Sequence, residues 1–214
     1  MTKPNPCIGV LAGTNGAGKS SVAGAFLRAA GGEYFNPDDA TQRILAVEPG
    51  ISEAQANSLA WQAGLRRLQS AIQEREDYWF ETTLGGNTIS ETLIAAASSG
   101  IEVHIWYVGL SSPELHIARV ATRVKRGGHA IPTDKIRERY GNSRRNLINL
   151  LPHLTALQVF DNSREADPAA GQQPQPALVL RMQHGKILNP DALPQAPEWA
   201  KPIISAALKL KPKT

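Results

Sequence analysis

The sequence predicts an α/β fold, a three-layer sandwich in which a five-stranded, mostly parallel sheet carries helices on both faces. Three observations favour it. Short apolar runs of strand length alternate with longer amphipathic segments along the chain. Polar or glycine-rich clusters directly follow the first three runs, as in sheets that bind ligands at the carboxyl ends of their strands. The 214 residues are enough for one such domain, 1–214, and too few for two large ones.

The first predicted strand, 7–12, leads into a segment that matches the phosphate-binding pattern G-x-x-x-x-G-K-[ST], and a helix is predicted over 21–30. Glycines let backbone amides approach phosphate oxygens, Lys19 can reach the β- and γ-phosphates, and the Ser20 hydroxyl suits Mg²⁺. The sequence therefore predicts a site for ATP and Mg²⁺; a glycine-rich turn with a chance lysine is the alternative. The expected nucleotide-binding residues are Gly13, Thr14, Asn15, Gly16, Ala17, Gly18, Lys19, Ser20 and Ser21.

A second predicted strand, 33–35, delivers two carboxylates to the same edge of the sheet. Asp38 is expected to contact the substrate and to accept a proton from its hydroxyl, as a catalytic aspartate does in phosphoryl transfer. The alternative is that Asp38 or Asp39 caps a helix that begins near Ala40. For Asp39, a cap or a solvated charge is the preferred interpretation.

The third predicted strand, 78–80, is followed by a second polar cluster, 81–86. Glu81 can hold Mg²⁺ or orient the attacking hydroxyl, and Thr83 can donate to a substrate oxygen; a turn or a helix cap is the alternative for the threonines. An amphipathic helix over 51–76 precedes this strand. Its Trp61 is expected in the core, with stacking on a substrate as the less favoured alternative.

A fourth strand, 102–109, precedes two predicted helices over 113–150, the second with Thr133 as its N-cap, separated by a Gly-Gly break. We interpret this region as a lid whose arginines meet the phosphates during transfer. A solvated helix face or an RNA-binding surface is the alternative. The basic residues are Arg119, Arg123, Lys125, Arg126, Arg137, Arg139, Arg144 and Arg145.

The fifth predicted strand, 156–160, ends in the cluster 161–163. A plain turn is the preferred interpretation of Asn162 and Ser163, and contact of their side chains with the purine base is the alternative. An exposed loop, an edge hairpin and a final helix are expected to follow, the last two over about 177–209.

Composition limits the classes of function. The net charge of +4 and pI of about 9.3 suit an anionic substrate, whereas the sequence has no Lys/Arg run typical of a nucleic-acid patch, so a nucleic-acid partner is not expected. The single cysteine, Cys7, cannot form an intramolecular disulfide. Neither a signal peptide nor a membrane-spanning segment is recognisable, and a cytoplasmic protein is the expectation.

Taken together, these clusters resemble the zeta-toxin family, in particular its bacterial branch of P-loop kinases or ATPases. The resemblance extends from Cys7 to about Leu188. Its carriers are the phosphate-binding segment 13–20, Asn36-Pro37-Asp38, Phe80-Glu81-Thr82-Thr83-Leu84, Arg126-Gly127-Gly128-His129-Ala130-Ile131-Pro132, Arg139-Tyr140 and Asp161-Asn162-Ser163.

The resemblance implies a P-loop kinase fold and an ATP-dependent transfer of phosphate to a hydroxyl group. Well-studied zeta toxins phosphorylate UDP-N-acetylglucosamine and are paired with an antitoxin protein. By analogy, Asp38 is the base, Lys19 and Ser20 are ligands of ATP and Mg²⁺, and Arg126 and Arg139 are the lid arginines. For an additional substrate-binding acid of the family, only Glu53 offers a counterpart.

The resulting expectation is a kinase that acts on a hydroxyl of a small anionic metabolite, with UDP-N-acetylglucosamine as one candidate. Two alternatives are a nucleic-acid end kinase and a nucleotide-binding regulatory protein with weak ATPase activity.

Overall fold

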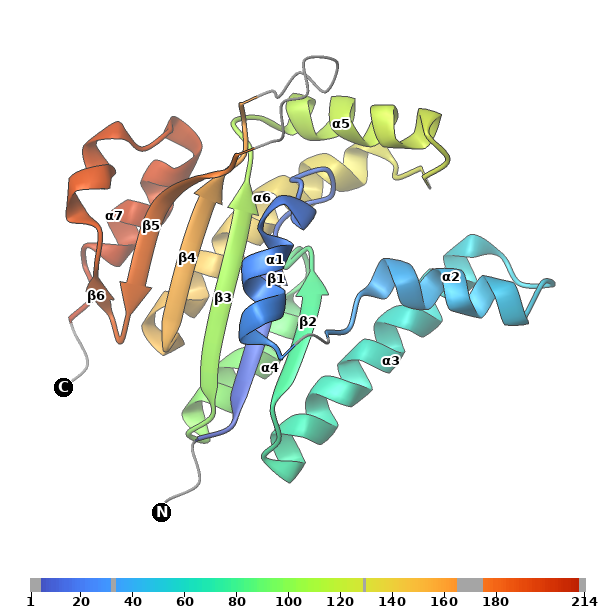
Figure 1. The fold of residues 1–214 in the computed structure, drawn as a ribbon, viewed down its shortest axis with the longest axis horizontal. Coiled ribbons are helices and arrows are strands. Elements are labelled where there is room, and N and C mark those ends of the chain that lie inside the picture. Colours follow the sequence, from blue (N-terminus) through green and yellow to red (C-terminus); the bar gives the residue numbers. More distant parts are fainter. Residues whose placement is uncertain (1–4, 32–33, 129, 165–174, 212–214) are drawn as a thin grey trace.

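The computed structural model describes residues 5–31, 34–128, 130–164 and 175–211. Its six strands form one sheet in the order β2-β1-β3-β4-β5-β6 (Figure 1). The first four are parallel to their neighbours, β5 is antiparallel to β4, and β6 is antiparallel to β5. The strands are β1 (Cys7–Ala12), β2 (Tyr78–Thr82), β3 (Glu102–Gly109), β4 (Ala156–Asp161), β5 (Ala177–Gln183) and β6 (Lys186–Ile187).

The sheet corrects the predicted count of five strands. The predicted strand 33–35 reduces to an isolated bridge between Phe35 and Phe80, and Glu33 lies outside the described residues. The predicted edge hairpin instead contributes two full members of the sheet, β5 and β6. Its two turn residues, His184 and Gly185, both have positive φ, which matches the right-handed twist of a two-residue hairpin.

Helices cover both faces of the sheet, as predicted. In Figure 1, α1 crosses in front of the sheet, while α4 and α6 lie behind it. The helices are α1 (Ser20–Ala29), α2 (Pro37–Val47), α3 (Glu53–Glu74), α4 (Asn87–Ser98), α5 (Pro113–Lys125), α6 (Thr133–Leu150) and α7 (Lys201–Ala207), with short 3-10 helices at Leu151–His153, Pro190–Gln195 and Glu198–Ala200.

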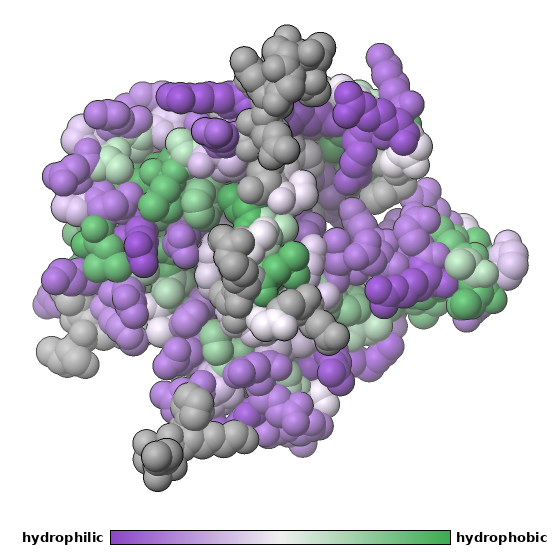
Figure 2. All heavy atoms as spheres, in the orientation of Figure 1, coloured by the Kyte–Doolittle hydropathy of each residue, from purple (hydrophilic) through white to green (hydrophobic). Residues whose placement is uncertain are grey.

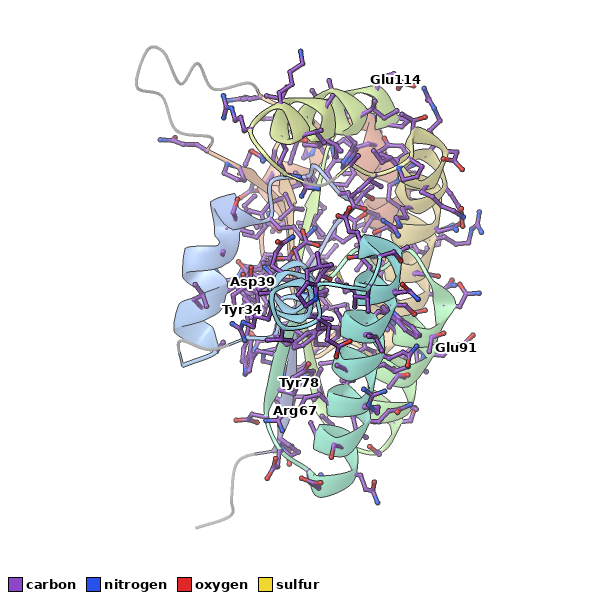
Figure 3. All side chains as sticks on the ribbon, turned by 90° about the vertical axis from the view of Figure 1, so that its right-hand side faces the viewer. Tyr34, Asp39, Arg67, Tyr78, Glu91 and Glu114 are labelled. Atoms are coloured by element: carbon purple, nitrogen blue, oxygen red, sulfur yellow. The ribbon has the colours of Figure 1, made fainter. Side chains whose placement is uncertain are left out.

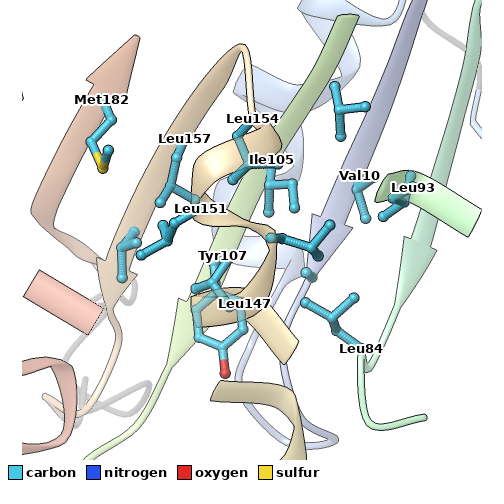
Figure 4. Packing of buried hydrophobic residues seen from close by; sticks show 14 of the residues in the cluster. Val10, Leu84, Leu93, Ile105, Tyr107, Leu147, Leu151, Leu154, Leu157 and Met182 are labelled. Carbon is cyan, nitrogen blue, oxygen red and sulfur yellow. The ribbon is translucent and has the colours of Figure 1, made fainter. Parts of the chain in front are cut away.

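The alternation of side chains along β1 explains why the core consists of two clusters, one on each face of the sheet. Ile8 and Val10 face the larger core cluster, which includes apolar side chains of α3, α4, α6 and α7. Figure 4 shows part of this cluster, with Val10, Leu93 of α4 and Leu147 of α6 labelled. Leu11 faces the smaller cluster under α1, where the Phe26 ring packs edge-on against Trp106. Both faces of the central strands are therefore buried, as is usual for parallel strands.

Two predicted helix starts are corrected. α2 begins at Pro37, and its N-cap is Asn36, whose Oδ1 accepts from Asp38 N at 2.9 Å, so neither Asp38 nor Asp39 is the cap. α6 has Pro132 at the N-cap position in place of the predicted Thr133.

The predicted lid, 113–150, consists of two helices of different character. α6 is anchored in the core through Ile136, Leu147 and Leu150, and its Ser143 contacts the buried Tyr107 hydroxyl at 3.1 Å. The surface of α5 that Figure 2 shows is mostly hydrophilic. Within the described part of the chain, none of the helices combines the length and apolar character needed to cross a bilayer.

Candidate functional site

The phosphate-binding segment 13–20 lies at the carboxyl end of β1, between β2 and β3. β2, which follows β1 in the chain, pairs with one edge of β1, and β3, which follows β2, pairs with the other edge. Open α/β sheets bind ligands at such a point. The backbone of the phosphate-binding segment requires glycine at positions 13 and 16. Gly16 has a φ of +81°, and a Cβ there would lie 2.7 Å from the His116 carbonyl oxygen. A Cβ at Gly13 would lie 2.2 Å from the Val108 carbonyl oxygen.

Two buried side chains form hydrogen bonds with backbone carbonyls of this segment. Asn162 Nδ2 donates to the Ala17 carbonyl at 2.9 Å, and His116 Nδ1 lies 2.8 Å from the Asn15 carbonyl oxygen. Burial lowers the pKa of His116 to about 4, so the ring is neutral at pH 7 and its Nδ1–H donates. Asn162 therefore braces the loop, and its contact with a purine base stays a prediction.

Sequence reasoning did not single out His116. The signal that could have found it is the spacing of His116 and Val120, which lie one turn apart on α5 and are both buried. The two residues mark the face of α5 that packs against Gly16.

Lys19 is folded back toward its own loop. Its Nζ donates to the Gly13 carbonyl at 2.8 Å and lies 3.4 Å from Glu81 Oε1, with side chains that are only 10% and 18% exposed. Ser20 is exposed as the first residue of α1, whereas the Ser21 side chain lies outside the described part of the structure. The structure thus brings the predicted lysine and the predicted Glu81 into direct contact.

A cleft of about 550 Å³ opens beside the loop. Figure 3 looks onto this side of the molecule, with Asp39 labelled on α2 and Glu114 on α5. The cleft brings together four residues that the sequence predicted for the site: Asn15, Asp38, Thr83 and Arg139. The other lining residues are Pro37, Asn57, Trp61, Thr82, Gly85, Gly86, Thr88, Ile89, Ala130, Ile131, Pro132, Lys135 and Glu138.

Asp38 reaches the cleft from the first turn of α2, and its side chain is 47% exposed. Arg123 of α5 approaches it, with Nη1 3.6 Å from Asp38 Oδ2. Gly128 leaves space for this arginine, because a Cβ at Gly128 would lie 2.7 Å from Arg123 Cγ. Asp39, the next residue, is exposed.

The two proposed lid arginines have different surroundings. Arg139 Nη1 donates to Asn15 Oδ1 at 2.7 Å, which ties α6 to the phosphate-binding segment. Arg126 is exposed at the C-cap of α5 and is not among the described residues that line the cleft. Arg123 is the arginine of α5 that reaches a predicted site residue, and His129 lies outside the described residues.

The loop after β2 is held in an unusual conformation. Leu84 is fully buried with a φ of +54°, a region that non-glycine residues rarely adopt. Asn146 of α6 donates through Nδ2 to the carbonyls of Leu84 and Gly86, both at 3.0 Å. No local pattern in the sequence indicates this contact, which holds the backbone beside Thr83.

Two further expectations concern side chains near the cleft. Trp61 was expected in the core, but it is 47% exposed and lines the cleft, so that prediction was wrong. Glu53 is exposed at the start of α3 and is not among the described lining residues, which gives no support to its role as a substrate-binding acid.

The residues present fit a magnesium ion held together with phosphates. Mg²⁺ is usually bound by one or two protein oxygens plus substrate phosphates and water. The Ser20 hydroxyl and the Glu81 carboxylate supply such oxygens. Groups of three or more His, Cys, Asp or Glu that could hold a metal are absent from the described residues.

Known proteins resemble this chain in sequence and in fold. An uncharacterized protein of Haemophilus influenzae is 34% identical over 128 residues, which cover 60% of this chain and 88% of that protein. The AvrRxo1-ORF1:AvrRxo1-ORF2 complex, with structures containing sulphate ions or ATP, has a chain with a TM-score of 0.66 at 16% identity. The match covers 98% of this chain but only 66% of the length of the AvrRxo1 chain.

Two other solved structures share the fold. A structure of the PezAT chromosomal toxin–antitoxin system of Streptococcus pneumoniae has a TM-score of 0.61 at 15% identity and covers 98% of this chain and 87% of its own. A putative kinase of Chloroflexus aurantiacus has a TM-score of 0.52 at 12% identity, over 64% of this chain and 78% of its own. The fold is that of P-loop kinases. The family model described as Zeta toxin matches residues 1–167, and the chain therefore belongs to the zeta toxin family.

Proposed function

We propose that this protein is an ATP-dependent phosphotransferase that acts on a hydroxyl group of a small anionic metabolite. The observation that carries the proposal is that Asp38 and Asn15 line one cleft, so a carboxylate and the phosphate-binding segment face the same space. UDP-N-acetylglucosamine is one candidate acceptor.

In the proposed reaction, the acceptor hydroxyl attacks the γ-phosphorus in line, the bond to the β–γ bridging oxygen breaks so that ADP leaves, and Asp38 accepts the hydroxyl proton. Lys19 would exchange its contacts with Gly13 and Glu81 for the β- and γ-phosphates, to which its charge is complementary. Arg139, tied to Asn15, would stabilise charge on the transferred group.

Ser20 and Glu81 would hold Mg²⁺ when it is bound with ATP, and the ion would neutralise phosphate charge. The proposed partners are therefore ATP, Mg²⁺ and a hydroxyl-bearing metabolite, with an antitoxin protein as a further partner by analogy with the PezAT system. The proposed compartment is the cytoplasm, where ATP is available.

The proposal is tested by transfer of label from γ-labelled ATP to a panel of UDP-sugars, nucleosides and oligonucleotide ends. Asp38→Asn should lower kcat by about 10²- to 10⁴-fold, because a general base contributes on that order, while ATP affinity stays near wild type. Asp39→Asn is the matched control, since Asp39 is an exposed neighbour on the same turn.

Lys19→Ala should weaken both ATP binding and turnover. Undiminished turnover in Asp38→Asn would remove Asp38 from the role of base. Hydrolysis of ATP that no member of the panel accelerates would favour a nucleotide-binding regulatory protein.

A further inference from the structure

Trp199 of the C-terminal segment reaches the loop that follows β4. It lies beyond residues 1–167, which the family model matches, and it is 4% exposed. Its Nε1 donates to Asp161 Oδ1 at 2.9 Å. The indole lies against Gly109, where an added Cβ would come within 2.3 Å of the ring atom Cη2. The close packing and the hydrogen bond together hold the indole in one orientation.

The Asp161 carboxylate organises the loop 161–163 around this hydrogen bond. Its Oδ1 also accepts from Ser163 N at 3.3 Å and from the Ser163 hydroxyl. The Ser163 Oγ in turn accepts from Ser111 N at 2.8 Å, which joins the loop after β4 to the loop after β3. Because the Trp199 indole donates from outside the loop, it anchors the carboxylate to the C-terminal segment.

Asn162, between Asp161 and Ser163, connects this loop to the phosphate-binding segment. Its Nδ2 donates to the Ala17 carbonyl at 2.9 Å, and the residue is only 3% exposed. The described peptide bonds are trans, so the Ala17 carbonyl and the Gly18 N–H point in opposite directions. A hydrogen bond that fixes the Ala17 carbonyl therefore also fixes the direction of the Gly18 N–H, away from Asn162.

We propose that Trp199 is a positioning residue for phosphate binding. Its indole N–H holds the Asp161 carboxylate in place. Through the adjoining Asn162, this contact keeps the Gly18 amide directed at a phosphate of the bound nucleotide, as backbone amides are in such loops. The inference rests on the proposed function, because it requires a nucleotide at the segment 13–20. Trp199 acts through Asp161 and does not itself contact the nucleotide.

A single substitution tests the hydrogen bond. Trp199→Phe removes the N–H donor and keeps a ring beside Gly109. Affinity for a non-hydrolysable ATP analogue, measured by calorimetry, should fall roughly 10-fold, the order expected when one charge-assisted hydrogen bond is misaligned. Tripolyphosphate, which lacks the base and the ribose, is the matched ligand and should lose affinity by the same factor. In transfer assays, kcat at saturating ATP should stay within about 2-fold of wild type, because lost ground-state binding raises KM alone.

Two further variants separate this effect from a general loss of structure. Asp161→Ala should also weaken ATP binding, and the double variant with Trp199→Phe should bind no more weakly than Asp161→Ala alone, since the indole acts through the carboxylate. Ile203→Ala is the control, because Ile203 is fully buried on α7, close in sequence to Trp199. It should lower the midpoint of thermal unfolding and keep wild-type ATP affinity. The same unfolding measurement verifies that each variant is folded at the assay temperature.

Unchanged affinity for the ATP analogue in folded Trp199→Phe would overturn the proposal. A loss that tripolyphosphate does not share, a loss that Ile203→Ala reproduces, or additive effects in the double variant would also overturn it. The kinase proposal is judged separately. If Trp199→Phe weakens ATP binding but the wild-type protein transfers no phosphate, the kinase proposal alone fails. If the wild-type protein transfers phosphate and Trp199→Phe binds ATP normally, the positioning role alone fails.

Discussion

Arg123 of α5 and Asp38 of α2 form an ion pair, with Arg123 Nη1 3.6 Å from Asp38 Oδ2. The contact joins α5, which packs on the phosphate-binding segment, to the first turn of α2. Since both side chains are more than a third exposed, the pair contributes little to stability. We expect its importance to be positional, because the arginine charge lies beside the carboxylate on which the proposed reaction depends.

Removal of the Arg123 charge should therefore reduce catalysis more than stability. Arg123→Gln is expected to lower kcat by about 10²-fold, the order of effect seen when a reacting group is misplaced. Arg123→Lys should recover part of this loss, because it restores the charge without the guanidinium geometry. Lys125→Gln, an exposed change in the same helical turn, is the control. Steady-state transfer assays measure the effect, and equal activity of all three variants would contradict it.

The close contact at Gly16 predicts a large effect of a single methyl group. Gly16→Ala must strain a φ of +81° and also place a Cβ 2.7 Å from the His116 carbonyl oxygen. Gly100 is a matched control, because it has the same φ but no heavy atom within 4 Å of an added Cβ. Gly100→Ala should cost about 1–2 kcal/mol of stability and leave ATP binding intact. Gly16→Ala should additionally weaken ATP affinity, as measured by calorimetry.

The buried His116 predicts a pH-dependent stability. Burial lowers its pKa to about 4, so between pH 6.5 and 4 the unfolded chain binds a proton that the folded protein does not. Stability should fall as the pH is lowered through this window. His116→Asn removes the titrating group and keeps a hydrogen-bond donor. Between pH 7 and 5, the free energy of unfolding of this variant should therefore fall by about 2 kcal/mol less than that of wild type.

The control for this experiment is His184→Asn, at an exposed turn position whose positive φ asparagine tolerates. Its stability should follow that of wild type at every pH. Denaturant unfolding at several pH values measures the difference, and parallel curves for wild type and His116→Asn would contradict the assignment.

The contacts of Asn146 predict that its substitution changes the KM for the acceptor more than the KM for ATP. Asn146→Ala leaves the Leu84 and Gly86 carbonyls without their donor, which should cost about 1–3 kcal/mol of stability. Because this loop lines the cleft beside Thr83, the acceptor KM should rise roughly 10-fold while the KM for ATP changes little. Asn149→Ala, at an exposed position on the same helix, is the control. A rise in both KM values would indicate a general loss of structure.

Local sequence signals predicted the parts of the site that depend on local structure. The phosphate-binding segment was recognisable because its glycines, Lys19 and Ser20 occupy fixed positions between a strand and a helix. Asp38 and Thr83 follow apolar runs, and both line the cleft. The carboxyl ends of parallel strands meet at one edge, so the topology alone brings such residues together.

Contacts between distant elements could not be predicted in this way. His116 and Asn146 bind backbone carbonyls that are 101 and 62 residues away in the sequence, and no spacing rule connects them. Trp61 has the helical spacing of a core residue, but its side of α3 faces a cleft formed by α2 and α6. The strand predicted at 33–35 is reduced to a single bridge beside the edge strand β2, because α2 begins at Pro37, with Asn36 as its N-cap, directly after Phe35.

The packing of Trp199 bears on how the protein should be produced. Residues 175–211 lie beyond the family match, yet within them β5 pairs with β4. The Trp199 ring also fills the space beside Gly109, and its Nε1 donates to Asp161 at 2.9 Å. A fragment cut after residue 167 would leave a bare strand edge and an empty slot large enough for an indole. Such a fragment should self-associate, since the unpaired edge of β4 would be a template for pairing with another chain.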